Sequence, residues 1–84
     1  DARRDEIDSL VAAKLAAGWS LTRLDKAMLK VLRAGTYELL ARADIPVAVA
    51  ISEYVDVAKA FFDDGQAKFV NGILDAVAKD ARPV

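Results

Sequence analysis

The chain contains no cysteine and no histidine. Without cysteine it can form no disulfide, no thiolate nucleophile and no zinc site that depends on thiolate ligands. Without histidine it lacks the commonest general base and the commonest metal ligand. We therefore expect a protein without a metal ion or a cofactor.

Long apolar runs are also missing. The longest, residues 45–51, holds seven residues and includes a proline, whereas a membrane-spanning helix needs about 20 apolar residues. No signal peptide is visible, so we expect a cytoplasmic protein with no membrane contact. The first residue is Asp1 rather than methionine, and we expect the chain to be a piece of a longer protein.

The residues that are present assemble no catalytic site. The four glycines, at positions 18, 35, 65 and 72, do not have the spacing of a phosphate-binding loop. Asp63 and Asp64 are adjacent, with Asp44, Glu53 and Asp56 not far away in sequence, but solvated acids are ordinary on loops and polar helix faces. The sequence therefore predicts a non-enzymatic protein.

Apolar periodicity predicts the fold. The 84 residues suffice for one domain over residues 1–84, and 55% of them are apolar. Apolar positions recur every three or four residues, which is typical of amphipathic helices. The breaks in this pattern predict four helices, over about residues 2–17, 21–42, 46–62 and 67–81. Because the loops are short, neighbouring helices are expected to be antiparallel, giving an all-α bundle.

Candidate capping residues mark the helix starts. Thr22 or Ser20 could cap the second helix, with Asp25 in its first turn. Asp44 stands where a cap of the third helix is wanted, and Pro46 suits the first turn of that helix. Residues 63–66 are expected to form the loop before the fourth helix.

The apolar stripes predict the core. Their members are Ile7, Leu10, Val11 and Leu15; Leu24, Met28, Val31, Leu32, Gly35 and Leu39; Ile51, Tyr54, Val55, Ala58 and Phe61 or Phe62; and Val70, Ile73, Leu74 and Val77. Glycine inside a helix costs about 0.5–1 kcal/mol relative to alanine. We expect another group to pack closely against Gly35, whereas Gly72 could be a tolerated weak spot.

The second predicted helix carries a basic stripe. Its members, at steps of three or four residues, are Arg23, Lys26, Lys30, Arg33 and Tyr37. The stripe could bind phosphates or an acidic protein surface. Alternatively, it is a solvated face whose cations pair with the third helix, since residues 43–64 carry a net charge of −4. The sequence pI of about 5.3 is far below the value above about 9 that is typical of nucleic-acid-binding domains.

An aromatic residue lies at the edge of the last apolar stripe. Phe69 is adjacent to Lys68 and close to Gln66 and Asn71. An exposed aromatic ring beside a cation and amides can stack on an unpaired base. The other interpretation is that Phe69 belongs to the margin of the core.

Several sequence blocks, in order, resemble the NusB family of bacterial transcription antitermination factors. The blocks are KFVNGILD at residues 68–75, LRAGTYEL at 32–39, DIP at 44–46, VAISE at 49–53 and AK at 58–59, preceded by GW at 18–19 and RL at 23–24. They cover the chain from about residue 18 onward. The resemblance implies a four-helix C-terminal subdomain of the NusB-like fold, with the N-terminal half of that fold absent.

The resemblance also implies a function in transcription antitermination without catalysis. Members of the family pair with the ribosomal small-subunit protein NusE. The pair binds the boxA element of nascent RNA and acts indirectly on the RNA polymerase elongation complex. Carried over by position, the expected RNA contacts are Lys68, Phe69, Asn71 and Gln66. The residues expected to meet the protein partner are Lys26, Met28, Lys30 and Arg33, whereas Tyr37 is expected in the core.

Two alternatives stay open. NusB-like domains also occur as the N-terminal part of a ribosomal RNA cytosine methyltransferase, although the end of the sequence at Val84 favours the stand-alone factor. The chain could also be a structural piece without RNA binding. Small helical units that expose apolar surface often associate with one another, so we expect the isolated chain to self-associate.

Overall fold

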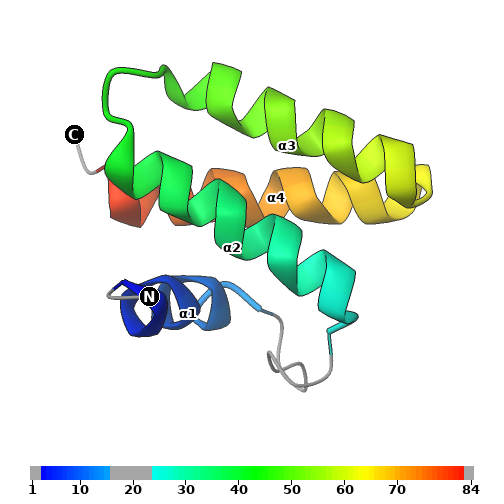
Figure 1. The fold of residues 1–84 in the computed structure, drawn as a ribbon, viewed down its shortest axis with the longest axis horizontal. Helices are drawn as coiled ribbons and strands as arrows, with labels where there is room; N and C mark the ends of the chain where they lie inside the picture. Colours follow the sequence, from blue (N-terminus) through cyan, green and yellow to red (C-terminus); the bar gives the residue numbers. More distant parts are fainter. Residues whose placement is uncertain (1–2, 16–23, 83–84) are drawn as a thin grey trace.

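The computed structural model describes residues 3–15 and 24–82, which form four α-helices (Figure 1). They are α1 (Arg4–Ala12), α2 (Lys26–Ala41), α3 (Val47–Phe61) and α4 (Asp64–Ala81). No β-strand occurs in these two stretches. The prediction of an all-α fold is confirmed.

Helix α4 lies behind α2 and contacts each of the other three helices (Figure 1). Helix α3 runs antiparallel to both α2 and α4. Helix α1 packs below α2 and contacts α2 and α4. The apolar sides of the helices meet around α4, which therefore supplies the largest share of the core.

The core contains the predicted stripes. Its buried apolar members are Ile7 and Val11 of α1, Met28, Leu32 and Leu39 of α2, Ala50, Ile51 and Ala58 of α3, and Ala67, Val70, Ile73, Leu74, Val77 and Ala78 of α4. Leu10, Leu15, Leu24 and Val31 are partly buried against this core, as are Tyr54, Val55 and Phe62. Of the two phenylalanines left open at the end of α3, Phe62 therefore packs inward, whereas Phe61 is 77% exposed.

Tyr37 was expected in the core and is instead 47% exposed. Helix geometry explains the difference. Each residue turns the helix by about 100°, so Tyr37 projects about 160° away from the buried Gly35. The position next to it, Thr36, is fully buried.

Aspartate caps set where two helices begin. The Asp25 carboxylate accepts hydrogen bonds from the main-chain N–H groups of Ala27 and Met28, at 2.8 and 3.4 Å. Asp25 is therefore the N-cap of α2 rather than a residue of its first turn. The alternatives Ser20 and Thr22 lie outside the described residues.

The start of α4 is also earlier than predicted. The Asp63 carboxylate accepts from the N–H of Gln66 at 2.8 Å, and the helix begins at Asp64 instead of residue 67. Gln66 is therefore in the first turn of α4 and not in a loop.

The other boundaries correct the prediction in smaller ways. The N-cap of α3 is Pro46, which makes no side-chain capping bond; the Asp44 carboxylate instead accepts two hydrogen bonds from Arg42, which lower its pKa. Helix α1 ends at Ala12 rather than at 17, because the N–H groups of Lys14 and Leu15 bond to carbonyls three residues back, which tightens the chain into a turn.

Gly35 is packed as closely as predicted. A Cβ atom at this position would lie 2.8 Å from Cδ1 and 3.0 Å from Cδ2 of Leu74, and 3.4 Å from Cγ of Tyr54. Leu74 is fully buried. The glycine therefore lets α2 approach α4 more closely than any other residue would.

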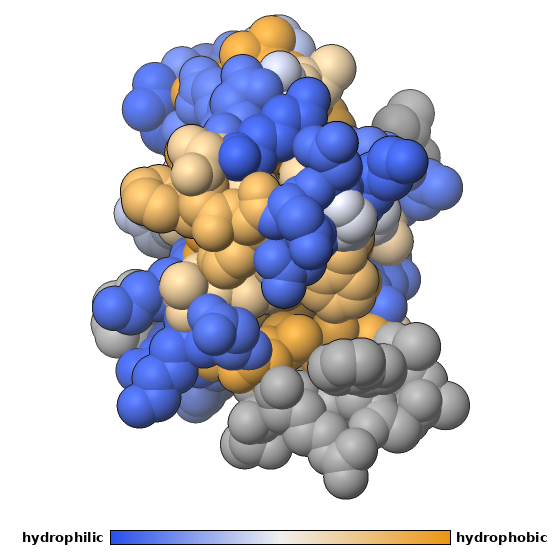
Figure 2. Space-filling view, turned by 90° about the vertical axis from the view of Figure 1, so that its right-hand side faces the viewer, coloured by the Kyte–Doolittle hydropathy of each residue, from blue (hydrophilic) through white to orange (hydrophobic). Residues whose placement is uncertain are grey.

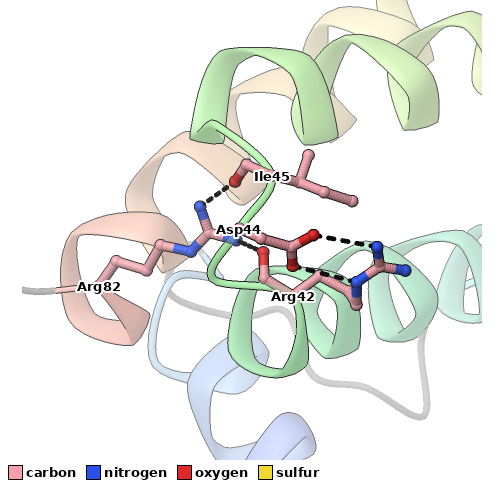
Figure 3. A network of polar contacts seen from close by, with 4 residues as sticks. All are labelled: Arg42, Asp44, Ile45 and Arg82. Carbon is pink, nitrogen blue, oxygen red and sulfur yellow. Dashed lines mark hydrogen bonds and ion pairs between the residues drawn. The ribbon is translucent and has the colours of Figure 1, made fainter.

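Arg82 closes the connection between α2 and α3. Its guanidinium donates to the main-chain carbonyl of Leu39 at 2.8 Å and to those of Arg42 and Ile45; Figure 3 shows the latter two contacts. The carbonyls at the end of a helix have no partners within it. The residue that follows α4 thus satisfies carbonyls at the end of α2 and in the loop after it.

Candidate nucleic-acid interface

The four residues predicted to bind RNA all lie in the first half of α4, and all four are exposed. Lys68 and Phe69 are followed at once by Val70, which is fully buried. The buried apolar side of α4 fixes the rotation of this helix about its axis. It therefore also fixes the directions in which the side chains of Lys68 and Phe69 project. Phe69 keeps 37% of its surface exposed.

The four residues do not form one cluster. With about 100° per residue, Phe69 and Asn71 project about 160° apart around α4, and Gln66 lies on the side of Phe69. Lys68 and Asn71 are three positions apart and share the side that faces α3. The predicted set therefore divides into two pairs on opposite flanks of the helix.

The Lys68 and Asn71 pair faces a groove between α3 and α4. The groove has a volume of about 350 Å³, and its other lining residues are Val55, Lys59, Asp64 and Ala67. Lys59 is not among the site residues predicted from the sequence, although it belongs to the AK block of the family resemblance. Lys59 and Lys68 put two cations on this groove, from different helices.

The flank of α4 that carries Phe69 lies at the end of the bundle where the loop connects α3 to α4. Figure 2 looks at this end and shows apolar and hydrophilic surface next to each other. The exposed phenylalanines Phe61 and Phe69 come from the last turn of α3 and the second turn of α4. Such a surface can stack on flat groups and still bind charge.

The predicted partner residues on α2 differ in accessibility. Lys26 and Lys30 are exposed. Arg33 is partly buried, with both ends of its fork bound to Asp8 of α1 at 2.8 and 2.9 Å. Hydrogen bonding to Asp8 raises the pKa of Arg33. Arg33 thus ties the stripe to α1. Among the members of the stripe that the structure describes, no cation forms the ion pair with the acidic α3 that one interpretation of the sequence predicted; Arg23 lies outside the described residues.

Met28 was expected to contact the protein partner, and its position in the structure does not fit that prediction. Its side chain is 4% exposed and packs in the core, because it lies on the same side of α2 as Leu32 and Gly35. It therefore has no free surface to offer a partner, and we leave it out of the candidate interface.

A second hollow lies on the outer side of α2, between α1 and α3. It has a volume of about 400 Å³ and is lined by Arg4, Ile7, Lys30, Arg33, Ala34, Tyr37 and Tyr54. Burial raises the pKa of Tyr54, and nearby Glu38 and Glu53 add to the effect. The lining of this hollow therefore combines two cations of the basic stripe, Lys30 and Arg33, with the phenol rings of Tyr37 and Tyr54.

Comparison with known proteins identifies the family. Residues 2–79 match the NusB family. The chain belongs to the NusB family.

Individual NusB proteins are similar over nearly the whole chain. The transcription antitermination protein NusB of Novosphingobium aromaticivorans is 67% identical over 82 residues, which are 98% of this chain and 55% of that protein. The protein of the same name from Sphingopyxis alaskensis is 62% identical over 96% of this chain and 54% of its own length. The chain thus spans about half the length of the curated relatives it matches.

A solved structure agrees with the fold. The structure of T. maritima NusB superposes with a TM-score of 0.86 at 44% identity, over 94% of this chain and 55% of that one. The arrangement of the four helices is therefore a NusB fold. The KFVNG segment of this chain, residues 68–72, lies in the first half of α4 and carries the exposed Lys68 and Phe69 beside the buried Val70.

Two further findings concern metal binding and membrane spans. Within residues 3–15 and 24–82, no group of three or more acidic side chains is placed to hold a metal ion. No helix in the described part of the chain is long and apolar enough to cross a membrane.

Proposed function

We propose that this chain is the C-terminal half of a transcription antitermination factor that binds boxA-type RNA together with the ribosomal small-subunit protein NusE. The curated relatives bear the name transcription antitermination protein NusB. The four helices and the ordered sequence blocks support assignment to the C-terminal half. The factor would act in the bacterial cytoplasm, on the RNA polymerase elongation complex, and without catalysis.

One observation carries the proposal for RNA. Lys68 and Phe69 are consecutive, exposed residues on a helix that is anchored by the buried Val70. The aromatic ring supplies a stacking surface, and the neighbouring ammonium group attracts phosphate. A single-stranded RNA with unpaired bases matches both features.

The partner surface is proposed on the exposed part of α2. Lys26 and Lys30 are accessible there, and Arg33 is held in place by Asp8. Cations on one helix side complement a partner surface that carries carboxylates. This surface is separate from the exposed side of α4, so RNA and protein could bind at the same time.

The test uses the full-length protein with NusE and a boxA RNA oligonucleotide. Stacking contributes about 1–3 kcal/mol per base, so Phe69→Ala should weaken RNA binding about 5- to 150-fold. Val49→Ala is the control for loss of an exposed apolar side chain, because Val49 is exposed in the first turn of α3, at the other end of that helix from Phe61 and Phe69. Equal RNA affinity of the Phe69→Ala variant and the unaltered protein would remove Phe69 from the site.

A second arm tests the charge. Lys68→Ala should lower the slope of log K against log salt by about one, since one fewer phosphate is neutralised. Lys79→Ala, near the end of the same helix, is the control for a general loss of positive charge. An unchanged slope for Lys68→Ala would show that Lys68 meets no phosphate.

A further inference from the structure

Gly72 is an exposed glycine in the middle of α4. No atom lies within 4 Å of the place where its Cβ would be. Glycine at such a position costs about 0.5–1 kcal/mol relative to alanine, so the helix is weakened there.

The described part of the chain offers no packing reason for this weakness. Gly35 is the contrast, because Leu74 fills the space that a Cβ would need. At Gly72 the equivalent space is open. A group from outside these residues would explain why the backbone is left bare.

The neighbours of Gly72 indicate what that group is. Lys68 is four positions earlier and Phe69 is three positions earlier, so both lie one turn before Gly72, one on each flank of it. Gly72 projects between them, about 40° from Lys68 and about 60° from Phe69. The bare backbone at Gly72 therefore lies on the open surface of α4, between a cation on one side and an aromatic ring on the other.

We propose that the sugar–phosphate backbone of the bound RNA crosses α4 at Gly72. This inference rests on the proposed function. Glycine permits close approach of a ligand to a helix backbone. With the backbone seated at Gly72, a phosphate can reach Lys68 while a base stacks on Phe69.

The experiment compares Gly72→Ala and Gly72→Leu with the unaltered full-length protein in complex with NusE. Each variant is measured for boxA RNA affinity and for thermal unfolding. We expect Gly72→Ala to unfold at an unchanged or higher temperature, because alanine favours the helix. We expect its RNA affinity to fall about tenfold, and that of Gly72→Leu to fall further, because side-chain atoms then occupy the surface on which the RNA backbone lies; tenfold corresponds to about 1.4 kcal/mol.

Ala60→Leu is the matched control for added apolar bulk, since Ala60 is exposed on the outer side of α3. It should leave RNA affinity unchanged. Unchanged RNA affinity in both Gly72 variants would overturn the inference, and so would a lower unfolding temperature for Gly72→Ala, which would show that another part of the protein packs there. If the unaltered complex itself fails to bind boxA RNA, the proposed function fails instead.

Discussion

Arg33 of α2 and Asp8 of α1 form a two-pronged ion pair, with Nε and Nη2 of the arginine 2.8 and 2.9 Å from the two carboxylate oxygens. The two residues are 25 positions apart in sequence. Arg4 approaches the same carboxylate at 3.9 Å. A single aspartate thus links α1 to the basic side of α2.

The first prediction concerns this pair. Arg33→Ala, Asp8→Ala and the double variant should show a coupling energy of about 0.5–1 kcal/mol, because the geometry is bidentate but the side chains remain partly exposed to solvent. Urea denaturation at low salt measures it. The coupling should shrink at 1 M salt; additive single effects at low salt would contradict it.

The second prediction concerns Arg82. Arg82→Ala should destabilise the protein by about 2 kcal/mol, because carbonyls of Leu39, Arg42 and Ile45 lose a charged donor. Arg82→Lys should recover only part of this loss, since an ammonium group lacks the planar fork of a guanidinium. Chemical denaturation measures the free energy of unfolding of both variants. If only the positive charge of Arg82 mattered, Arg82→Lys would be as stable as the unaltered protein.

The third prediction concerns Gly35. Gly35→Ala should destabilise the protein by about 1 kcal/mol, because the clash with buried Leu74 outweighs the helical preference of alanine. Leu74→Val in the same chain should reduce the penalty of Gly35→Ala, since it relieves that contact. A Gly35→Ala variant as stable as the unaltered protein would show that Leu74 moves aside freely.

The fourth prediction concerns Tyr54. In a Tyr37→Phe variant, Tyr54 is the sole tyrosine. The change in ultraviolet absorbance that accompanies tyrosine ionisation then reports on Tyr54 alone. Its pKa should lie above the value of about 10 that is usual for tyrosine, chiefly because of burial. Glu38→Gln should lower this pKa, because a nearby negative charge is removed.

The same shift has a consequence for stability. A tyrosine whose pKa is raised by folding stabilises the native state below pH 10, and that contribution is lost as the pH rises through the raised pKa. Stability should therefore fall on the alkaline side. A stability profile that is identical in Tyr54→Phe would show that other groups cause the fall.

Much of the core could be predicted from sequence, because burial follows the helical period. The stripe Val70, Ile73, Leu74 and Val77 is buried as expected. The position of Tyr37 shows the limit: an aromatic next to apolar residues resembles a core residue, but its rotation relative to Gly35 directs it outward. Helix starts were less predictable, since Asp25, Asp44 and Asp63 are all possible caps and only local backbone geometry selects among them.

The candidate site was predictable in part. The resemblance selected Lys68 and Phe69, and both are exposed. Met28 was selected by position alone and is buried, because its neighbours on the inner side of α2 decide its environment. Contacts between distant residues, such as those of Arg33 with Asp8 and of Arg82 with Leu39, left no periodic signal in the sequence.

The division of the predicted RNA contacts between two flanks of α4 restricts the form of the nucleic acid. A ligand that meets both Phe69 and Asn71 must curve around a cylinder about 10–12 Å across. A single RNA strand can follow such a curve, because its backbone turns at every nucleotide. If both residues take part, the ligand must reach two flanks of one helix, which favours a flexible strand with unpaired bases.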